Sequence, residues 1–299
     1  MLGSVLSLLS AFFWASAVIL FKKSGEVFSP ISLNIYKSFV ALILVSLTMV
    51  ILNIPFFPDK PINDWLLLAA SGFIGITLAD LFFFIALNRL GAGLVAIVEC
   101  LYLPSVIFFS FILLGENLSV GAIIGGLLVL TAVFVGSIKR KKDLDKTLKQ
   151  RRENKNPLPG IIIGCLSMIF LAAGIVMIKN LLERTDVFWA TLVRVTAATV
   201  SLLVLILFHP KRKQYFRELK FSKGWLIALP ASFTGNYLAL LCWVAGMKYT
   251  TASRAAILNQ MSTIFIFILA AIFLKEKITV NKSIAILLAL TGACLAIFI

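Results

Sequence analysis

Four ionisable residues, Lys37, Asp80, Glu99 and Arg194, stand inside long apolar runs of the sequence. Charged side chains are costly inside a bilayer, so they pair with one another or mark the path of a proton or substrate. Asp80 lies seven residues before the end of its run, and Glu99 lies seven residues after the start of the next. At about 1.5 Å of helical rise per residue, both lie roughly 10 Å from the same membrane face, and Lys37 enters its run to a similar depth.

The equal depths predict that Lys37 pairs with Asp80 or with Glu99. Two carboxylates beside one cation leave one of them without a counter-charge, and such a group can exchange protons. One interpretation is therefore a cluster coupled to protons or to substrate. The other is a structural ion pair that fixes three helices.

Arg194 lies in the second half of the chain, where the apolar runs contain no acid. It either meets an anionic substrate group such as a carboxylate, or extends toward Glu183 and Asp186 at the membrane surface. Aromatic rings and amides complete a typical solute site. The further candidates for substrate binding are Trp14, Tyr102, Asn236, Asn259 and Gln260, with Tyr237 and Trp243 nearby. Each is equally compatible with an interhelical hydrogen bond or a lipid-interface aromatic.

The residue types of a metal, nucleotide or catalytic centre form no recognisable pattern. The chain has one histidine, four cysteines in separate runs, and no P-loop, HExxH or GxSxG sequence. We therefore predict no metal, no cofactor, no ATP-driven pump and no enzyme activity.

The elements that must position these residues are membrane helices. The chain has 299 residues, of which 61% are apolar and 14% charged, and its mean hydropathy is +1.03, which does not fit a soluble protein. A spanning helix needs about 20 mostly apolar residues. Ten such runs occur, at 2–21, 31–52, 65–87, 92–114, 118–138, 159–181, 187–208, 224–246, 252–274 and 279–299.

A basic segment divides these runs into two groups of five. Residues 139–157 hold nine Lys or Arg and three acids, which predicts a solvated linker between a first unit, 1–138, and a second, 158–299. The linker either sets the orientation of the chain in the membrane and tethers the two units, or it has a regulatory or lipid-binding role. Among loop residues, 21 Lys or Arg lie on the linker side and four on the other, which places both termini outside. The net charge of +15 thus indicates orientation rather than nucleic-acid binding.

The two units match each other without gaps over most of their length. A shift of 160 or 157 residues gives these pairs: Trp65 with Trp225, Phe73 with Phe233, Gly75 with Gly235, Glu116 with Glu276, Ser10 with Ser167, and Lys37 with Arg194. Because each unit has an odd number of spans, the second enters the membrane upside down. We predict an all-α integral membrane protein with ten transmembrane helices in two inverted-topology five-helix repeats.

At the junction of the fourth and fifth runs the sequence reads LGENLS from Leu114 to Ser119, followed by Gly121 and Gly125, with Pro104 upstream. The second copy reads LKEKIT from Leu274 to Thr279. On these residues the whole chain resembles the EamA family of the drug/metabolite transporter superfamily. It departs from the family pattern at Lys275, in place of a glycine, and at Ile264, opposite Pro104. In the family the motif glutamate lies at a helix junction, so for Glu116 and Glu276 we expect a structural role as acceptors for free N–H groups near a helix start.

The resemblance implies a secondary transporter of a small metabolite, an amino acid or similar amphipathic solute, working by alternating access in the cell (cytoplasmic) membrane. Helices 1, 3, 4, 6, 8 and 9 are expected to line its central cavity. The resemblance does not decide whether the solute is exported or imported, or whether transport is coupled to protons. The expected partners are the lipid bilayer, a small-molecule substrate and protons, with the chain a monomer or weak homo-oligomer. The alternative function is a membrane-embedded enzyme acting on a lipid-linked substrate, for which the sequence offers no nucleophile, base or metal cluster.

Overall fold

The computed structural model describes residues 2–115, 120–137, 157–220, 224–276 and 279–298, which form helices joined by short loops. The first half contains α1 (Leu2–Ser24), α2 (Pro30–Ile51), α3 (Ile62–Gly72), η1 (Phe73–Leu78), α4 (Ala79–Leu90), α5 (Ala92–Glu99), α6 (Tyr102–Leu114) and α7 (Val120–Ser137). The second half contains α9 (Leu158–Val176), α10 (Lys179–Glu183), α11 (Val187–Phe208), α12 (Arg212–Glu218), α13 (Trp225–Ser232), η2 (Phe233–Ala239), α14 (Leu240–Tyr249), α15 (Ala252–Asn259), α16 (Met261–Phe273) and α17 (Val280–Phe298).

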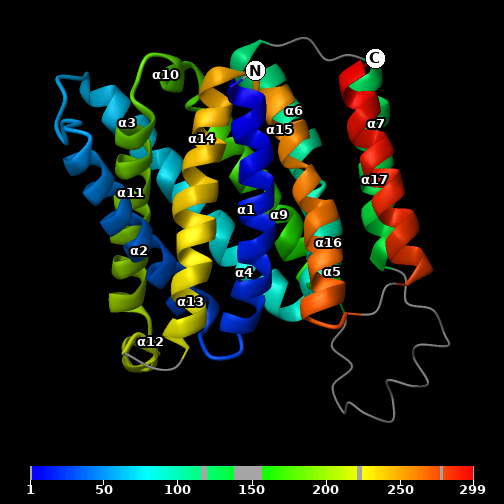
Figure 1. Cartoon of the computed structure of the whole chain (residues 1–299), viewed down its shortest axis with the longest axis horizontal. Coiled ribbons are helices and arrows are strands. Elements are labelled where there is room, and N and C mark those ends of the chain that lie inside the picture. The colour runs from blue at the N-terminus through cyan, green and yellow to red at the C-terminus, as the bar shows by residue number, and fades with distance from the viewer. Residues whose placement is uncertain (1, 116–119, 138–156, 221–223, 277–278, 299) are drawn as a thin grey trace.

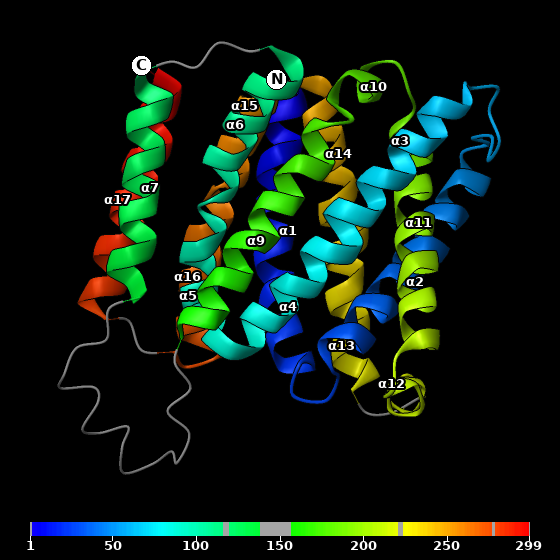
Figure 2. The same ribbon diagram turned by 180° about the vertical axis from the view of Figure 1, so that it is seen from behind.

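Among the described residues, eight helical rods are long and apolar enough to cross a membrane. They are Leu2–Ser24, Pro30–Ile51, Ile62–Leu90, Ala92–Leu114, Leu158–Val176, Val187–Phe208, Trp225–Tyr249 and Arg254–Phe273. Helices α7 and α17 carry shorter apolar stretches and lie side by side at one edge of the bundle (Figures 1 and 2). All of these elements lie within a few residues of the predicted runs. The short helices α10 and α12 were not predicted.

Two π-helical segments interrupt the third and eighth runs at matching positions. Segment η1 begins at Phe73 and η2 begins at Phe233, 160 residues later. A π-helix displaces the regular hydrogen-bond ladder, leaves carbonyl groups free for side-chain donors, and is frequent at functional sites. Both segments lie at mid-height of the bundle beside α9 or α1.

Contacts between the two halves are also duplicated. Ser10 on α1 donates a hydrogen bond to the Ala239 carbonyl at 3.0 Å, and Ser167 on α9 donates to the Ala79 carbonyl at 2.7 Å. Both donors and both acceptors are partners in the predicted repeat. Helix α1 runs downward from the N-terminus in Figure 1, whereas α9 runs upward toward α10 (Figure 2). These equivalent contacts in opposite directions support the inverted repeat.

Close helix approach at the two π-segments depends on small residues. A Cβ atom on Gly174 would stand 2.7 Å from the Cα of Gly75, and a Cβ atom on Gly235 would stand 2.7 Å from the Cβ of Ala17. These two pairs are again repeat partners. Small residues at such crossings let membrane helices approach closely, which brings η1 and η2 to the centre of the bundle.

The two ends of the bundle differ in charge. Both termini lie at the upper end in Figure 1, and helix α12 and the α1–α2 turn lie at the lower end. The lower end carries Lys22 and Lys23 in the last turn of α1, Arg89 in the last turn of α4, and the basic helix α12. The loops therefore fall on the two sides as predicted. Assignment of the upper end to the outside of the cell stays a prediction.

Glu276, in the loop before α17, binds the start of a helix in the other half. Its two carboxylate oxygens accept hydrogen bonds from the backbone N–H groups of Ala92 and Gly93 at 2.8 and 3.0 Å, and Lys282 lies 3.4 Å away. The glutamate thus caps α5 rather than its own helix, which joins the two halves at the lower end. Its predicted partner Glu116 lies outside the described residues.

We expect Glu276→Ala to lower the stability of the protein by about 1–3 kcal/mol, because two buried N–H groups lose their acceptor. Thermal unfolding in detergent measures the effect. Lys282→Gln is the matched control and should cost under about 1 kcal/mol, since its ion pair is long and partly exposed. Equal losses in the two variants would contradict a capping role for Glu276.

Candidate functional site

A central cavity of about 90 Å³ is lined by residues of both π-segments. Its lining comes from six of the predicted spans, the first, third, fourth, sixth, eighth and ninth, which are the six implied by the resemblance. The lining residues are Ser10, Trp14, Gly75, Ile76, Asp80, Glu99, Tyr102, Met168, Leu171, Gly235, Asn236, Ala239, Leu240, Trp243, Asn259, Gln260 and Ser262. Seven of the nine residues predicted from the sequence are among them. Lys37 and Arg194 lie behind the cavity wall.

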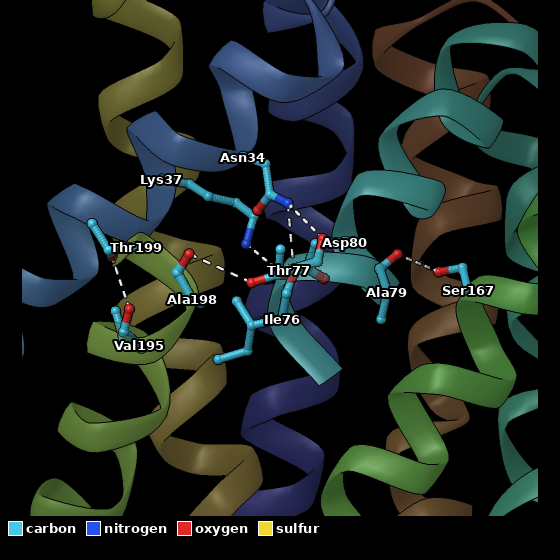
Figure 3. Close-up of polar contacts among 10 residues, drawn as sticks. All are labelled: Asn34, Lys37, Ile76, Thr77, Ala79, Asp80, Ser167, Val195, Ala198 and Thr199. Atoms are coloured by element: carbon cyan, nitrogen blue, oxygen red, sulfur yellow. Dashed lines mark hydrogen bonds and ion pairs between the residues drawn. The ribbon is translucent and has the colours of Figure 1, made fainter. Parts of the chain in front are cut away.

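Lys37 and Asp80 form a buried ion pair. The Lys37 ammonium reaches from α2 to the Asp80 carboxylate at 2.5 Å, and only 1% of the lysine side chain is exposed (Figure 3). The ammonium also lies 5.7 Å from the centre of the Phe84 ring. Asp80 stands in the first turn of α4, directly after η1. Lys37 thus takes Asp80, one of the two acids that the sequence offered as its partner.

Side chains from three neighbouring helices hold η1 in place around this pair. Asn34 donates to the carbonyls of Ile76 and Thr77 at 3.5 and 3.1 Å, while Thr77 donates to Ala198 at 3.4 Å (Figure 3). Ser167 holds the carbonyl of Ala79 from the far side. The carbonyls that a π-helix frees are thereby satisfied, and Asp80 is fixed in orientation.

Removal of one member of the Lys37–Asp80 pair leaves an uncompensated buried charge. We expect Lys37→Met and Asp80→Asn each to destabilise the protein by about 3 kcal/mol or more, and Lys37→Met combined with Asp80→Leu to recover most of the loss. Thermal unfolding of the purified variants tests this. A double variant no more stable than the single ones would show that the pair is not an independent structural unit.

Glu99 does not pair with Lys37. Its Oε1 atom accepts a hydrogen bond from the indole of Trp14 at 2.7 Å, and its Oε2 atom has no partner among the described residues. The side chain is buried at the end of α5, where a break of two residues precedes α6. The alternative of a Lys37–Glu99 pair was wrong, because Asp80 takes the lysine. Glu99 faces the cavity without a cation bound to it.

Arg194 does not extend to the surface, so that alternative was also wrong. Its side chain is 0% exposed. Both acids predicted as surface partners of Arg194 bind other groups. Glu183 pairs with Lys179 at 2.6 Å, and Asp186 accepts hydrogen bonds from the backbone at the start of α11. The inward direction is favoured because small residues of η1 leave room for the guanidinium.

The Arg194 guanidinium stands directly behind the cavity wall. Nε donates to the Ser71 hydroxyl at 3.0 Å, whereas Nη1 and Nη2 have no hydrogen-bond partner among the described residues. Its central carbon lies 5.6 Å from the centre of the Trp243 ring, which lines the cavity. Nη2 lies 3.4 Å from the place where a Cβ of Gly75 would stand, so the absence of a side chain there brings the cation to the cavity.

Asp80 is close enough to Arg194 for their charges to attract. The acid that the second half lacks is therefore supplied by the first half. With Lys37 and Arg194 facing a single carboxylate, this side of the cavity has one excess positive charge, which favours an anionic group in the cavity.

Amides and aromatic rings complete the wall. The Asn236 and Asn259 side-chain carbonyls have no donor among the described residues, while Gln260 donates to Thr263 at 3.3 Å. The Trp243 indole donates to the Tyr102 hydroxyl at 3.1 Å, which closes one side of the cavity with a contact between the two halves. The free amide oxygens can accept hydrogen bonds from hydroxyl or ammonium groups.

Sequence reasoning missed the partner of Arg194 and the supports of the π-segments. Ser71, Asn34 and Thr77 are small polar residues within apolar runs, and such residues are common in membrane helices, so their types alone do not distinguish them. The signal that was available is the matched pair Gly75 and Gly235, because both glycines line the cavity.

Comparison with known proteins places the chain among transporters. The model of the EamA-like transporter family matches residues 1–138 and 158–298. The uncharacterized transporter YetK of Bacillus subtilis (strain 168) is 34% identical over 126 residues, which cover 42% of this chain and 37% of that protein. An uncharacterized transporter of Archaeoglobus fulgidus is 24% identical over 285 residues, covering 93% of this chain and 92% of the relative. A solved crystal structure has the same fold, with a TM-score of 0.71 and 17% identity over 99% of this chain and 96% of that one.

Proposed function

Because this chain belongs to the EamA-like transporter family, we propose that it is a secondary transporter of a small amphipathic solute with a carboxylate group, such as an amino acid. The observation that carries the proposal is the buried guanidinium of Arg194 beside the central cavity, with two nitrogens that lack a partner among the described residues. A planar guanidinium binds a carboxylate through two parallel hydrogen bonds. Trp14, Tyr102 and Trp243 supply apolar faces for the rest of the solute.

The cavity also offers acceptors for a positively charged group of the solute. Glu99 and the carbonyl oxygens of Asn236 and Asn259 line the same cavity as acceptors. An ammonium group would donate to these oxygens while the carboxylate meets Arg194. This division of charge between the two sides of the cavity favours a zwitterion over a purely anionic solute.

Glu99 is the group that we propose carries a coupling proton. Asp80 has its charge balanced by Lys37 at 2.5 Å, whereas among the described residues Glu99 has only the neutral Trp14 indole as a hydrogen-bond partner. A buried carboxylate without a cation is costly, so it takes up a proton when the solute leaves and releases it when an ammonium group arrives. Proton and substrate would then exchange at one site, which gives antiport.

Alternating access would use the ten-span inverted repeat. The duplicated contacts of Ser10 with Ala239 and Ser167 with Ala79 support two equivalent interfaces between the halves. Rocking of one half against the other would open the cavity to each end in turn. The Glu276 contact with α5 lies at the lower end, so it would break in the state that opens there.

Counterflow in proteoliposomes tests the function. Purified protein in vesicles loaded with unlabelled amino acids should take up the same labelled amino acids with saturation. Amino-acid amides, in which the carboxylate is blocked, should compete at least about tenfold less well, because a charge-assisted hydrogen bond is lost. Equal competition by acid and amide would exclude the carboxylate, and the absence of saturable uptake for every solute tested would exclude a carrier.

A further inference from the structure

A second cavity opens on the side of the bundle, away from the central one. It has a volume of about 820 Å³ and lies between α2, α11 and α13. Its lining is almost wholly apolar and consists of Ile35, Tyr36, Phe39, Val40, Ile43, Leu44, Thr199, Leu203, Leu219, Trp225, Leu229, Pro230 and Phe233. We refer to these residues as the lateral groove. Phe39, Leu229 and Phe233 are 55%, 49% and 42% exposed, so the groove faces the hydrocarbon of the bilayer.

One polar group in the lateral groove lacks a partner. Tyr36 is 4% exposed and lies between Phe28, stacked at 5.8 Å, and Trp225, edge-on at 4.7 Å. Its hydroxyl has no hydrogen-bond partner among the described residues. Tyr36 stands six residues after the start of α2, roughly 9 Å along the helix, which is near the level of lipid ester groups. A buried hydroxyl at this depth calls for an acceptor.

The lower end of the lateral groove is basic. Helix α12 begins with Arg212 and is held against α2 and α11 by Tyr215, and Leu219 directly after it lines the groove. Four exposed cations, Arg212, Lys213, Arg217 and Lys220, lie on α12 or directly after it, and we refer to these four as the cations of α12. A fifth exposed cation, Lys211, lies directly before the helix.

The acid nearest to these cations is already engaged. Glu218 accepts from the Ser29 backbone at 3.0 Å and from Gln214 at 2.8 Å. Burial alone would raise the pKa of Glu218, but hydrogen bonds from Ser29, Ser32 and Gln214 keep that pKa below its ordinary value. Glu218 is therefore ionised at neutral pH and cancels only one of the five positive charges.

We propose that the lateral groove is a binding site for one anionic phospholipid. An acyl chain lies along the apolar wall, a glycerol ester oxygen accepts the hydrogen bond of Tyr36, and the phosphate and headgroup meet the cations of α12. Each part of the site matches one part of that ligand: an apolar trough of acyl-chain size, an unpartnered donor at the depth of the ester groups, and a cluster of cations at the headgroup level.

Native mass spectrometry of the protein released from nanodiscs tests the site. In equal mixtures of palmitoyl-oleoyl phosphatidylglycerol and phosphatidylcholine, the wild-type chain should retain one phosphatidylglycerol with about a tenfold preference. Replacement of the four cations of α12 by glutamine should abolish the preference. Leu229→Trp, which fills the groove, should reduce retention of both lipids, and Tyr36→Phe should reduce retention of phosphatidylglycerol about fivefold.

The linker provides a control with the same change of net charge. Replacement of Lys139, Arg140, Lys141 and Lys142 by glutamine removes four positive charges from the linker side of the chain and should leave the preference intact. Equal retention of the two lipids by the wild type would overturn the proposal. An equal loss in the linker variant would also overturn it, because the preference would then come from overall charge and not from the groove.

Discussion

Replacement of Arg194 by methionine should abolish saturable amino-acid uptake without destabilising the protein. Two of its guanidinium nitrogens have no partner among the described residues, so the removal of a buried charge offsets the loss of the hydrogen bond to Ser71, the contact with the Trp243 ring and the attraction of Asp80. A buried charge without full hydrogen bonding lowers the stability of the protein and is retained where function requires it. We expect an unfolding temperature equal to or above that of the wild type, together with a loss of carboxylate affinity of about 10- to 100-fold.

Arg194→Lys and Arg184→Gln complete this experiment. Lysine keeps the charge but offers no planar fork, so Arg194→Lys should recover only part of the uptake. Arg184 forms an ion pair at 2.6 Å with the buried carboxylate of Asp64, so Arg184→Gln should lower stability but leave transport by the folded protein at the wild-type level. If Arg194→Met unfolds at a lower temperature and its remaining folded fraction transports at the wild-type rate, Arg194 is a structural residue.

Glu99→Gln should separate exchange from proton coupling. Glutamine resembles the protonated acid and keeps an acceptor for the Trp14 indole, so counterflow of solute without a gradient should continue. The affinity for the solute should be lower, because its ammonium group loses a charged acceptor. Accumulation driven by a pH gradient should disappear, and for a wild type that exchanges one proton this amounts to about tenfold per pH unit. Uptake by proteoliposomes with and without the gradient measures both properties.

Glu183→Gln is the matched control for Glu99→Gln. Glu183 is exposed and pairs with Lys179 within α10, away from the cavity. Its removal should leave both exchange and gradient-driven accumulation at wild-type levels. A gradient that still drives full accumulation in Glu99→Gln would remove Glu99 as the proton carrier. Intact coupling in Asp80→Asn as well would remove the proton hypothesis for the whole cluster.

The sequence located the spans and the charged residues with little error. The run predicted at 187–208 is helix α11 from Val187 to Phe208, and the other described spans differ from their runs by a few residues. Apolar length is imposed by the bilayer, which leaves no irregular lipid-facing backbone, so it can be read from one chain. The equal depths of Lys37, Asp80 and Glu99 likewise limited the partner of the lysine to two acids, one of which is correct, because the helical rise is constant.

Tertiary structure decided which partner each charge takes. Lys37 had two acids at one depth, and only the packing of α2 against α4 selects Asp80 and leaves Glu99 with Trp14. Arg194 had an inward and an outward course, and the missing side chain at Gly75 opens the inward one. Depth along a helix follows from residue number, but rotation and lateral neighbours depend on how all the helices pack.

The π-segments likewise separate what the sequence determines from what helix packing decides. The repeat pairs Phe73 with Phe233 and Gly75 with Gly235, so the sequence by itself determined that both halves treat these positions alike. It did not determine that the helices widen there. Side chains of other helices donate to carbonyls at the end of each π-segment, Ser167 to Ala79 and Ser10 to Ala239. Those donors come from the opposite half, more than 80 residues away, and only the folded bundle brings them together.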